Sequence, residues 1–153
     1  MPQGLVPALN KVEVGGVPLE MEWEASGEIY PGDVVEFDQT DCPKIKAGTA
    51  SSDGILGVAA VSVGSITMRG AKRTVAYAAS DQVKVICGPI VVMLRLAASA
   101  DITCGDHLKA ADSGEVDEYT CASDTACALL AQALETLSVN TLAFQWIMAK
   151  WLK

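Results

Sequence analysis

The chain contains one short sequence pattern twice, and this repeat restricts its fold more than any other feature. Pro31–Val35 (PGDVV) returns as Cys104–Leu108 (CGDHL), with Asp33 and Asp106 73 residues apart. Each copy continues through a polar turn into a strand of small residues. In such turns glycine permits the bend, and aspartate holds it with a local hydrogen bond. The repeat therefore predicts two similar β units, and the absence of a reactive group at matched positions favours a scaffold over an active site.

Composition sets the kind of core and excludes two classes of partner. Half of the 153 residues are apolar but only 5% are aromatic, so the core is expected to be Val, Ile, Leu and Ala packed in tight sheets. The net charge is −8. Because nucleic acids and anionic membranes bind basic surfaces, we expect neither direct nucleic-acid binding nor membrane association. The sequence also lacks an apolar run of membrane-spanning length.

Residues 1–11 are predicted to form an extended N-terminal arm, followed by a single β-rich domain over residues 12–153. Two prolines oppose helix formation in the arm. Its apolar side chains need cover, either on the chain's own body or on a neighbour. The candidate partner contacts there are Leu5, Val6, Pro7 and Leu9. The first residues do not resemble a signal peptide, so synthesis in a cytoplasm is expected.

A hairpin is predicted at the start of the domain, with Gly15-Gly16 as its turn between residues 11–14 and a strand from Val17. The second strand alternates apolar and acidic residues, and Pro18 places it at a sheet edge. Its acidic face consists of Glu20, Glu22 and Glu24. This face is either solvated, which blocks edge-to-edge aggregation, or a docking face for a basic partner.

The rest of the chain is predicted to be mostly strands. The expected strands cover residues 34–37, 55–65, 74–79, 82–87, 90–96, 116–119 and 142–149. Residues 122–137 fit two structures: a helix capped by Ser123 or Asp124, or a strand that matches the first copy of the repeat. The repeat favours the strand. The fold class is therefore all-β, a compact barrel or tulip-like domain of two similar units with at most one short helix.

No pattern for catalysis, metal binding or a cofactor emerges, so we expect neither an enzyme nor a cofactor. The only histidine, His107, lies in a Gly-Asp turn, and no nucleophile motif accompanies it. The five cysteines show no C-x-x-C spacing, which indicates buried, inert thiols in a reducing compartment.

Two further groups are candidate partner contacts. One is a basic cluster of Arg69, Lys72 and Arg73, which is either a surface loop tip or an electrostatic contact with an acidic neighbour. The other is the aromatic C-terminal region, where Trp146 and Trp151 are either core residues or anchors of an oligomer interface.

The repeated Gly-Asp turn, the Ile55–Ala60 strand and the Gly105–Gly114 segment resemble the capsid decoration, or cement, proteins of tailed bacteriophages and related viruses. The resemblance covers roughly residues 27–149. It departs from the family pattern at Ala131, which replaces the second glycine, and in the five cysteines.

This resemblance implies a non-enzymatic, head-stabilising protein of the virion. Such a homotrimer binds the outer surface of the capsid, bridges subunits of the major capsid protein and stabilises the shell against internal DNA pressure. The alternative is a lipoyl- or biotinyl-like carrier or a small binding module. A carrier needs a lysine on an exposed hairpin tip, and the nearest approach to that motif is Met148-Ala149-Lys150 near the C-terminus.

Overall fold

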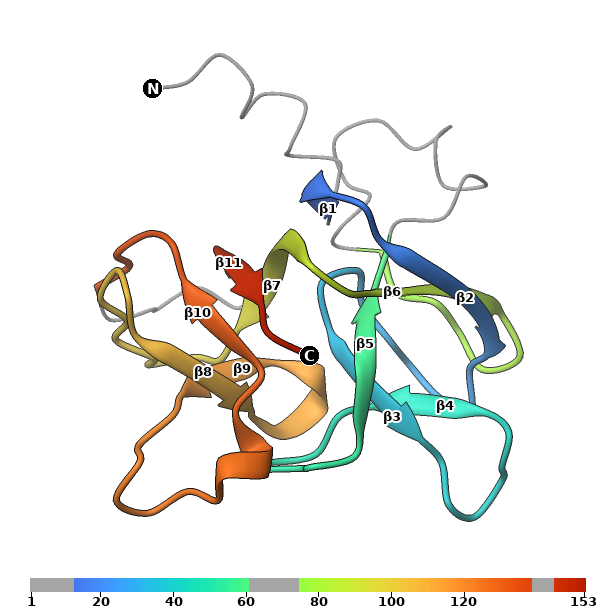
Figure 1. Ribbon diagram of the computed structural model, residues 1–153. Coiled ribbons are helices and arrows are strands. Elements are labelled where there is room, and N and C mark those ends of the chain that lie inside the picture. The colour runs from blue at the N-terminus through green and yellow to red at the C-terminus, as the bar shows by residue number, and fades with distance from the viewer. Residues whose placement is uncertain (1–12, 61–74, 139–144) are drawn as a thin grey trace.

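The computed structural model describes residues 13–60, 75–138 and 145–153 (Figure 1). The predicted arm and the basic cluster lie outside the described residues, as do parts of the predicted strands at residues 11–14, 55–65, 74–79 and 142–149. The strands are β1 (Glu13–Gly16), β2 (Leu19–Glu24), β3 (Val34–Phe37), β4 (Ile45–Ala47), β5 (Ile55–Ala59), β6 (Gln82–Cys87), β7 (Ile90–Leu96), β8 (His107–Ala110), β9 (Val116–Glu118), β10 (Ala131–Ala133) and β11 (Gln145–Trp151). Two short 3-10 turns, η3 (Asp112–Gly114) and η4 (Ala126–Ala128), are the helical elements of the described chain.

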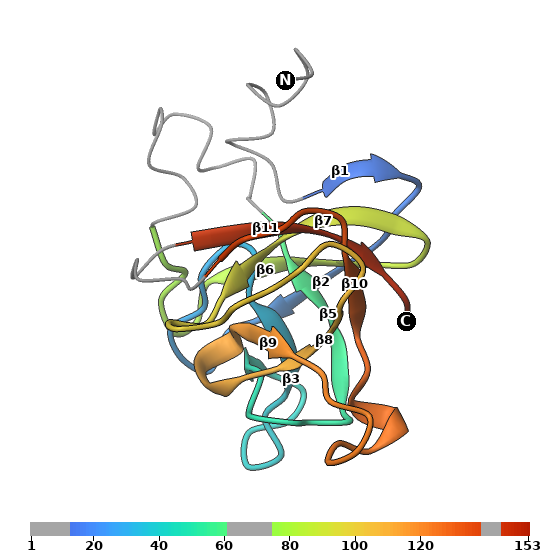
Figure 2. The same cartoon turned by 90° about the vertical axis from the view of Figure 1, so that its left-hand side faces the viewer.

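The strands form two units with the same topology. In the first unit the strand order is β2-β6-β5-β3-β4, and a parallel bridge between Ala25 and Ile45 joins its two ends. In the second unit the order is β7-β11-β10-β8-β9, and the parallel pair Leu96–Val116 closes it into a barrel. β1 adds a sixth strand to the second unit beside β7, as Figure 2 shows. The fold is therefore all-β and built from two similar units, as predicted.

The residue pairs across the strands confirm the internal repeat. Val35 of β3 lies opposite Gly57 of β5, and their counterparts Leu108 and Ala131 lie opposite each other in β8 and β10. The bridges that close the two units also match, since Ala25 lies 71 residues before Leu96 and Ile45 lies 71 residues before Val116. A strand register is specified residue by residue, so this agreement shows that the two copies share one backbone plan.

The repeated turns have the predicted chemistry. Gly32 and Gly105 have φ of +93° and +99°, a conformation that glycine adopts without steric cost. In each turn the aspartate side chain accepts a hydrogen bond of 2.8 Å from a backbone amide three residues earlier, at Tyr30 for Asp33 and at Thr103 for Asp106. The glycine and aspartate then exchange backbone hydrogen bonds with a buried alanine of the neighbouring strand.

A third turn of this type went unnoticed in the sequence. The carboxylate of Asp81 accepts a hydrogen bond of 2.7 Å from the amide of Ala78, and Ser80 has φ of +73° in the glycine position. Its buried alanine partner is Ala25, which bonds to Ser80 and Asp81 as the alanines do in the other two turns. Because serine replaces glycine, this copy lacks the Gly-Asp pattern of the other two.

Two local predictions were wrong. Gly15-Gly16 is not a hairpin turn, because both residues belong to β1, which pairs with β7 while β2 pairs with β6. Gly16 instead permits close packing, since a Cβ at this position would lie 2.4 Å from the carbonyl oxygen of Pro89. Residues 75–79 do not form a strand, and only Tyr77 makes a β-bridge, to Ile29.

The ambiguity over residues 122–137 is resolved in favour of the repeat. The described chain has β10 at the position that matches β5, and η4 is its only helical turn in this region. Residues 82–87 and 90–96 form the predicted strands β6 and β7 on either side of the Gly88-Pro89 break.

The core is continuous between the two units. One buried cluster lies inside the first unit and includes Ile29, Val35 and Val85. A larger cluster fills the second unit and extends to Val34 and Ile86 of the first. Strands of the first unit are therefore apolar on both faces because one face packs inside and the other packs on the second unit. None of the helical turns described is long and apolar enough to cross a membrane.

Candidate functional site

A buried polar cluster joins the two units where the first Gly-Asp turn meets β7. The Arg95 side chain donates from Nε to Asp33 Oδ1 at 2.5 Å, from Nη1 to Glu115 Oε1 at 2.8 Å and from Nη2 to the carbonyl oxygen of Ser113 at 2.6 Å. Its guanidinium also lies 4.9 Å from the centre of the Tyr30 ring. We call these five residues the Arg95 cluster. Because they come from both units, the cluster fixes the units to each other.

Burial governs the electrostatics of this cluster. Asp33 is completely buried and Arg95 is 6% exposed. Loss of hydration raises the pKa of Asp33 to about 6, although the hydrogen bond and charge of Arg95 oppose the shift. Burial also raises the pKa of Glu115. A buried charge is tolerated only with a partner, so the cluster is a structural ion pair, and removal of one member leaves another uncompensated.

The turn that carries Asp33 is docked by its backbone as well. The carbonyl oxygen of Gly32 accepts a hydrogen bond of 3.0 Å from the amide of Arg95, and that of Pro31 accepts one of 3.1 Å from Trp146 Nε1. A Cβ on Gly32 would lie 2.7 Å from the same indole nitrogen. In the second copy, by contrast, nothing lies within 4 Å of a Cβ on Gly105. One turn therefore forms the contact between units, and its counterpart is exposed.

The outer edges of β2 and β7 differ in the same way. The amide of Ala25 donates a hydrogen bond to the carbonyl of Asp81, so the backbone groups of Ala25 point toward β6. Successive residues of a strand point their backbone groups to opposite edges, so those of every second residue before Ala25 also point toward β6. The amides and carbonyls of Glu20 and Glu22 consequently face away from the sheet, and among the described residues no strand pairs with them. We call Leu19–Glu22 the open edge.

The counterpart of the open edge in β7 is covered. β1 pairs with Ile90 through Gly16 and with Val91 through Gly15. Further along β7, the carbonyl oxygen of Gly32 accepts a hydrogen bond from the amide of Arg95. The side chains differ as well, since Ile90 is 1% exposed within the core of the second unit and its counterpart Leu19 is 62% exposed.

The three predicted glutamates lie on β2, and two of them form ion pairs. Glu20 is 3.2 Å from Lys84 Nζ, and Glu24 is 3.2 Å from Lys44 Nζ. Glu22 is exposed and has no ion pair among the described residues. The expected edge position of this strand is confirmed, because among the described strands only β6 pairs with β2 along its length. Its role as a docking face stays a prediction.

The two tryptophans fill different roles. Trp151 is 2% exposed inside the core of the second unit, so it is a core residue, one of the two possibilities foreseen for it. Trp146 is half-buried and binds the Pro31 carbonyl, so it anchors the contact between the units of one chain. The arm residues Leu5, Val6, Pro7 and Leu9 and the basic residues Arg69, Lys72 and Arg73 lie outside the described residues.

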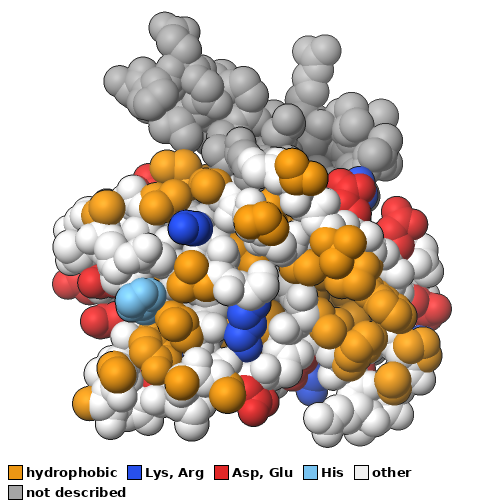
Figure 3. All heavy atoms as spheres, viewed as in Figure 1, with side chains coloured by type: hydrophobic (Ala, Val, Ile, Leu, Met, Phe, Trp, Pro, Cys, Tyr) orange, Lys and Arg blue, Asp and Glu red, His pale blue; other side chains and the backbone are white. Residues whose placement is uncertain are grey.

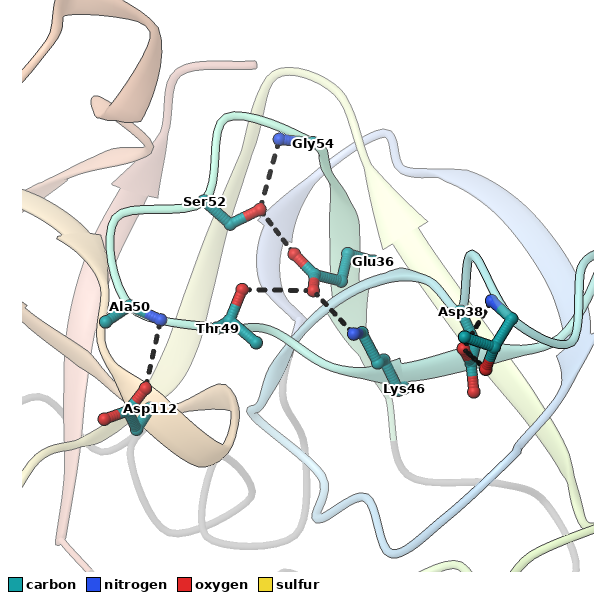
Figure 4. A network of polar contacts seen from close by, with 9 residues as sticks. Glu36, Asp38, Lys46, Thr49, Ala50, Ser52, Gly54 and Asp112 are labelled. Carbon is teal, nitrogen blue, oxygen red and sulfur yellow. Dashed lines mark hydrogen bonds and ion pairs between the residues drawn. The ribbon is translucent and has the colours of Figure 1, made fainter.

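A polar network on the first unit orders one loop (Figure 4), and its residues Glu36, Lys46, Thr49 and Ser52 also line an open pocket of about 540 Å³. The buried carboxylate of Glu36 accepts hydrogen bonds from Ser52 and Thr49 and lies 3.5 Å from Lys46 Nζ. The loop it orders reaches the second unit, where the amide of Ala50 donates to Asp112 Oδ1 at 3.2 Å. The hydroxyls of Ser52 and Thr49 and the ammonium group of Lys46 satisfy the Glu36 carboxylate. The network thereby holds the loop in place for its contact with the second unit.

The described residues contain no cluster of three or more His, Cys, Asp or Glu side chains that could hold a metal ion. His107 is exposed at the start of β8. The five cysteines are free, but the prediction that they are buried was wrong, because four of them are exposed on loops and turns: Cys42, Cys104, Cys121 and Cys127. Lys150, which the carrier hypothesis requires at a hairpin tip, instead lies within β11 opposite Gln132.

The open edge was only partly visible in the sequence. Its position at a sheet edge followed from Pro18, but the exposure of Val17 and Leu19, at 82% and 62%, did not follow from alternation. Figure 3 shows hydrophobic side chains gathered over the first unit. Arg95 was recognisable as a lone charge within the apolar run Ile90–Leu96, which is a sign of a buried ion pair.

Comparison with known proteins identifies the fold. No protein family matches the sequence, and no curated protein is similar to it. Among solved structures, the chain is similar to the crystal structure of the head fiber gp8.5 N base of bacteriophage phi29, with a TM-score of 0.55 and 14% sequence identity. The match covers 90% of this chain and 99% of that one. At this level of identity the similarity shows that the two proteins share a fold.

Proposed function

We propose that this protein is a structural component of a virion that attaches to the outer surface of a phage head. The observation that carries the proposal is the fold, since the two-unit architecture matches almost the whole base of a head fiber. The fold by itself does not define a function, so the nature of the surface has to agree with it.

The surface and interior agree with a structural role. The buried Arg95 cluster is paired internally through hydrogen bonds and ion pairs, and it links the two units. The acidic net charge disfavours contact with packaged DNA. These properties suit a non-enzymatic protein on the outside of a capsid, and they support the major capsid protein as its partner.

We further propose that the protein binds as a homotrimer and bridges neighbouring subunits of the shell. Bridging stabilises a lattice because each contact is repeated over many copies, so that weak individual contacts sum to strong attachment. The open edge and the exposed Val17 give the described surface an apolar contact region that a monomer leaves in water.

The test is binding to heads of the virus that encodes the chain. Purified protein is mixed with heads that lack it, and the heads are sedimented and imaged by electron cryomicroscopy. We expect the protein to sediment with the heads, to occupy regular positions on their outer surface and to raise the temperature at which they release DNA. Protein that stays in the supernatant at all concentrations would contradict the proposal.

A further inference from the structure

The internal repeat offers a way to find a missing partner. Two units with one backbone plan present the same edges, so an edge that is covered in one and open in the other shows where a contact is absent from a single chain. The outer edge of β7 is covered by β1 and by the Gly32 turn. The outer edge of β2 has no strand on it among the described residues.

We propose that the open edge, Leu19–Glu22, accepts an added β-strand from residues 1–12 of a second copy of this chain. This proposal deepens the proposed function, in which the protein is an oligomer, by naming the surface and the segment that join its copies. Strand addition supplies backbone hydrogen bonds to an unpaired edge and places alternate side chains against its exposed apolar residues.

The first argument is the precedent within the molecule. In the second unit an extended segment, β1, pairs with Ile90 and Val91. The counterparts of these residues in the first unit are Leu19 and Glu20, whose edge has no strand on it in the described part of the chain. Ile90 is 1% exposed within the core of the second unit, whereas Leu19 is 62% exposed. A strand in the same place would bring apolar side chains beside Leu19 and would satisfy the outward amides of Glu20 and Glu22.

The second argument is charge. The open edge carries Glu20 and Glu22, and only Glu20 has an ion pair among the described residues, with Lys84. Residues 1–12 contain no Asp or Glu in a chain with a net charge of −8, and they include Lys11. The stretch Ala8–Val12 has no proline, and Pro7 stands where a proline is tolerated, at the start of a strand. This segment is thus apolar and basic, as the open edge requires.

The third argument is the hazard of leaving the edge open. An unpaired edge flanked by exposed apolar side chains, here Val17 and Leu19, promotes uncontrolled pairing unless charges or cover protect it. Pairing each edge with the segment of a neighbour is a heterologous contact, which closes into a ring when the rotation between copies allows it. A ring of three copies would leave no open edge.

The test uses the full chain alone, without heads, so its outcome is independent of attachment. Equal amounts of unlabelled and ¹⁵N-labelled protein are unfolded together, refolded and treated with a carbodiimide, which links a lysine to a carboxylate in direct contact. Mass spectrometry then identifies the linked peptides. We expect links between Lys11 and Glu20 or Glu22, with mixed-isotope pairs as abundant as same-isotope pairs, because the two residues belong to different copies. Links of one isotope only, or no such links, would overturn the proposal.

Variants distinguish strand addition from simple proximity. Glu22→Pro removes an amide that faces away from β6, so it blocks an added strand and preserves the β2–β6 pairing. Glu22→Ala is the matched control, which keeps the backbone amide. We expect Glu22→Pro to lose the mixed-isotope links to Glu20 and to lower the mass measured by light scattering, while Glu22→Ala retains both.

A second variant guards against misfolding of the proline variant. Leu19→Lys adds a charge at an exposed position and leaves the backbone unchanged, so it should fold and should also weaken the association. If both Glu22→Pro, when folded, and Leu19→Lys keep the mass and the mixed-isotope links of the unaltered protein, the open edge is not the contact. Head binding measured separately then decides the proposed function, whichever way this test falls.

Discussion

The two units share a backbone plan but differ in the face that each presents outside its own core. In the first unit this face carries Val34 and Ile86, which are buried against the second unit. Their counterparts in the second unit are His107 and Lys150, which are exposed. The same strand positions therefore hold apolar residues where the units meet and polar residues where the second unit meets water.

This difference teaches that the contact between units is used once per chain. The first Gly-Asp turn docks on β7 through Arg95 and Trp146. The counterpart of Arg95 in β2 is Glu24. If the exposed second turn docked on β2, the carboxylates of its Asp106 and of Glu24 would repel each other. The chain thus cannot extend itself by repeating its internal contact, and the open edge of β2 is left for a different partner.

The largest change in the free energy of unfolding is expected from exchanging an apolar and a charged side chain at one pair of matched positions, Ile86 and Lys150. Ile86→Lys places an ammonium group in the contact between units and should lower the free energy of unfolding by more than about 4 kcal/mol, because a buried charge has no partner there. Lys150→Ile, at the exposed counterpart, should change it by less than about 0.5 kcal/mol. Urea unfolding of both variants measures the difference. Equal effects would show that the two faces are alike.

Breaking the Arg95 cluster should come next in magnitude. Arg95→Met leaves Asp33 buried without a counter-charge, so at pH 7 we expect a loss of about 3 to 5 kcal/mol. The control is Lys109→Met, which removes the more exposed Lys109–Asp124 pair of the second unit and should cost about 1 kcal/mol or less. Chemical denaturation at constant pH compares the two. A smaller loss for Arg95→Met than for its control would contradict the assigned role.

The matched glycines test the docking of the turn. Both have positive φ, so alanine at either position should cost about 1 to 2 kcal/mol in backbone strain. Gly32→Ala should cost a further 1 to 3 kcal/mol, roughly, because its Cβ would collide with Trp146. Thermal unfolding of both variants gives the difference, and a Gly105→Ala variant that is the less stable of the two would argue against the docked turn.

A further expected effect is a pH dependence that belongs to Asp33. Its pKa is raised to about 6 by burial, against 3.8 in the unfolded chain, so the folded state holds the proton more tightly. The stability this provides is fully present below pH 4 and is lost as the pH rises through 6, an amount on the order of 3 kcal/mol. Subtracting the profile of Asp33→Asn, which cannot titrate, isolates it. A difference that grows with pH over this range would reverse the predicted sign.

Most of the fold could be predicted from the sequence because turn chemistry is local. Gly-Asp before a strand specifies its bend within four residues, and matching the copies correctly assigned β10 as a strand against its helical spacing. Gly15-Gly16 misled because glycine serves close packing as well as turns, and only the position of Pro89 distinguishes the two uses.

The contact residues were harder to predict because they depend on which surfaces meet. An apolar strand has the same sequence pattern whether it packs inside its own unit or against another unit. The sequence therefore does not show that Ile86 packs against the second unit. Whether the outer edge of β2 is paired depends on where β1 lies, and the sequence pattern places β1 beside β2 although it pairs with β7. The pairing of Arg95 with Asp33 joins residues 62 positions apart, which no local pattern specifies.

The most direct test of the central claim, that one unit has a covered edge and the other an open one, is amide hydrogen exchange of the dilute protein. The amide of Arg95 donates to the carbonyl of Gly32, whereas the amides of Glu20 and Glu22 face away from the sheet. We predict slow exchange at Arg95 and fast exchange at both glutamates, with the glutamates becoming protected as the protein concentration rises. Equal protection of all three amides at the lowest concentration would contradict the account.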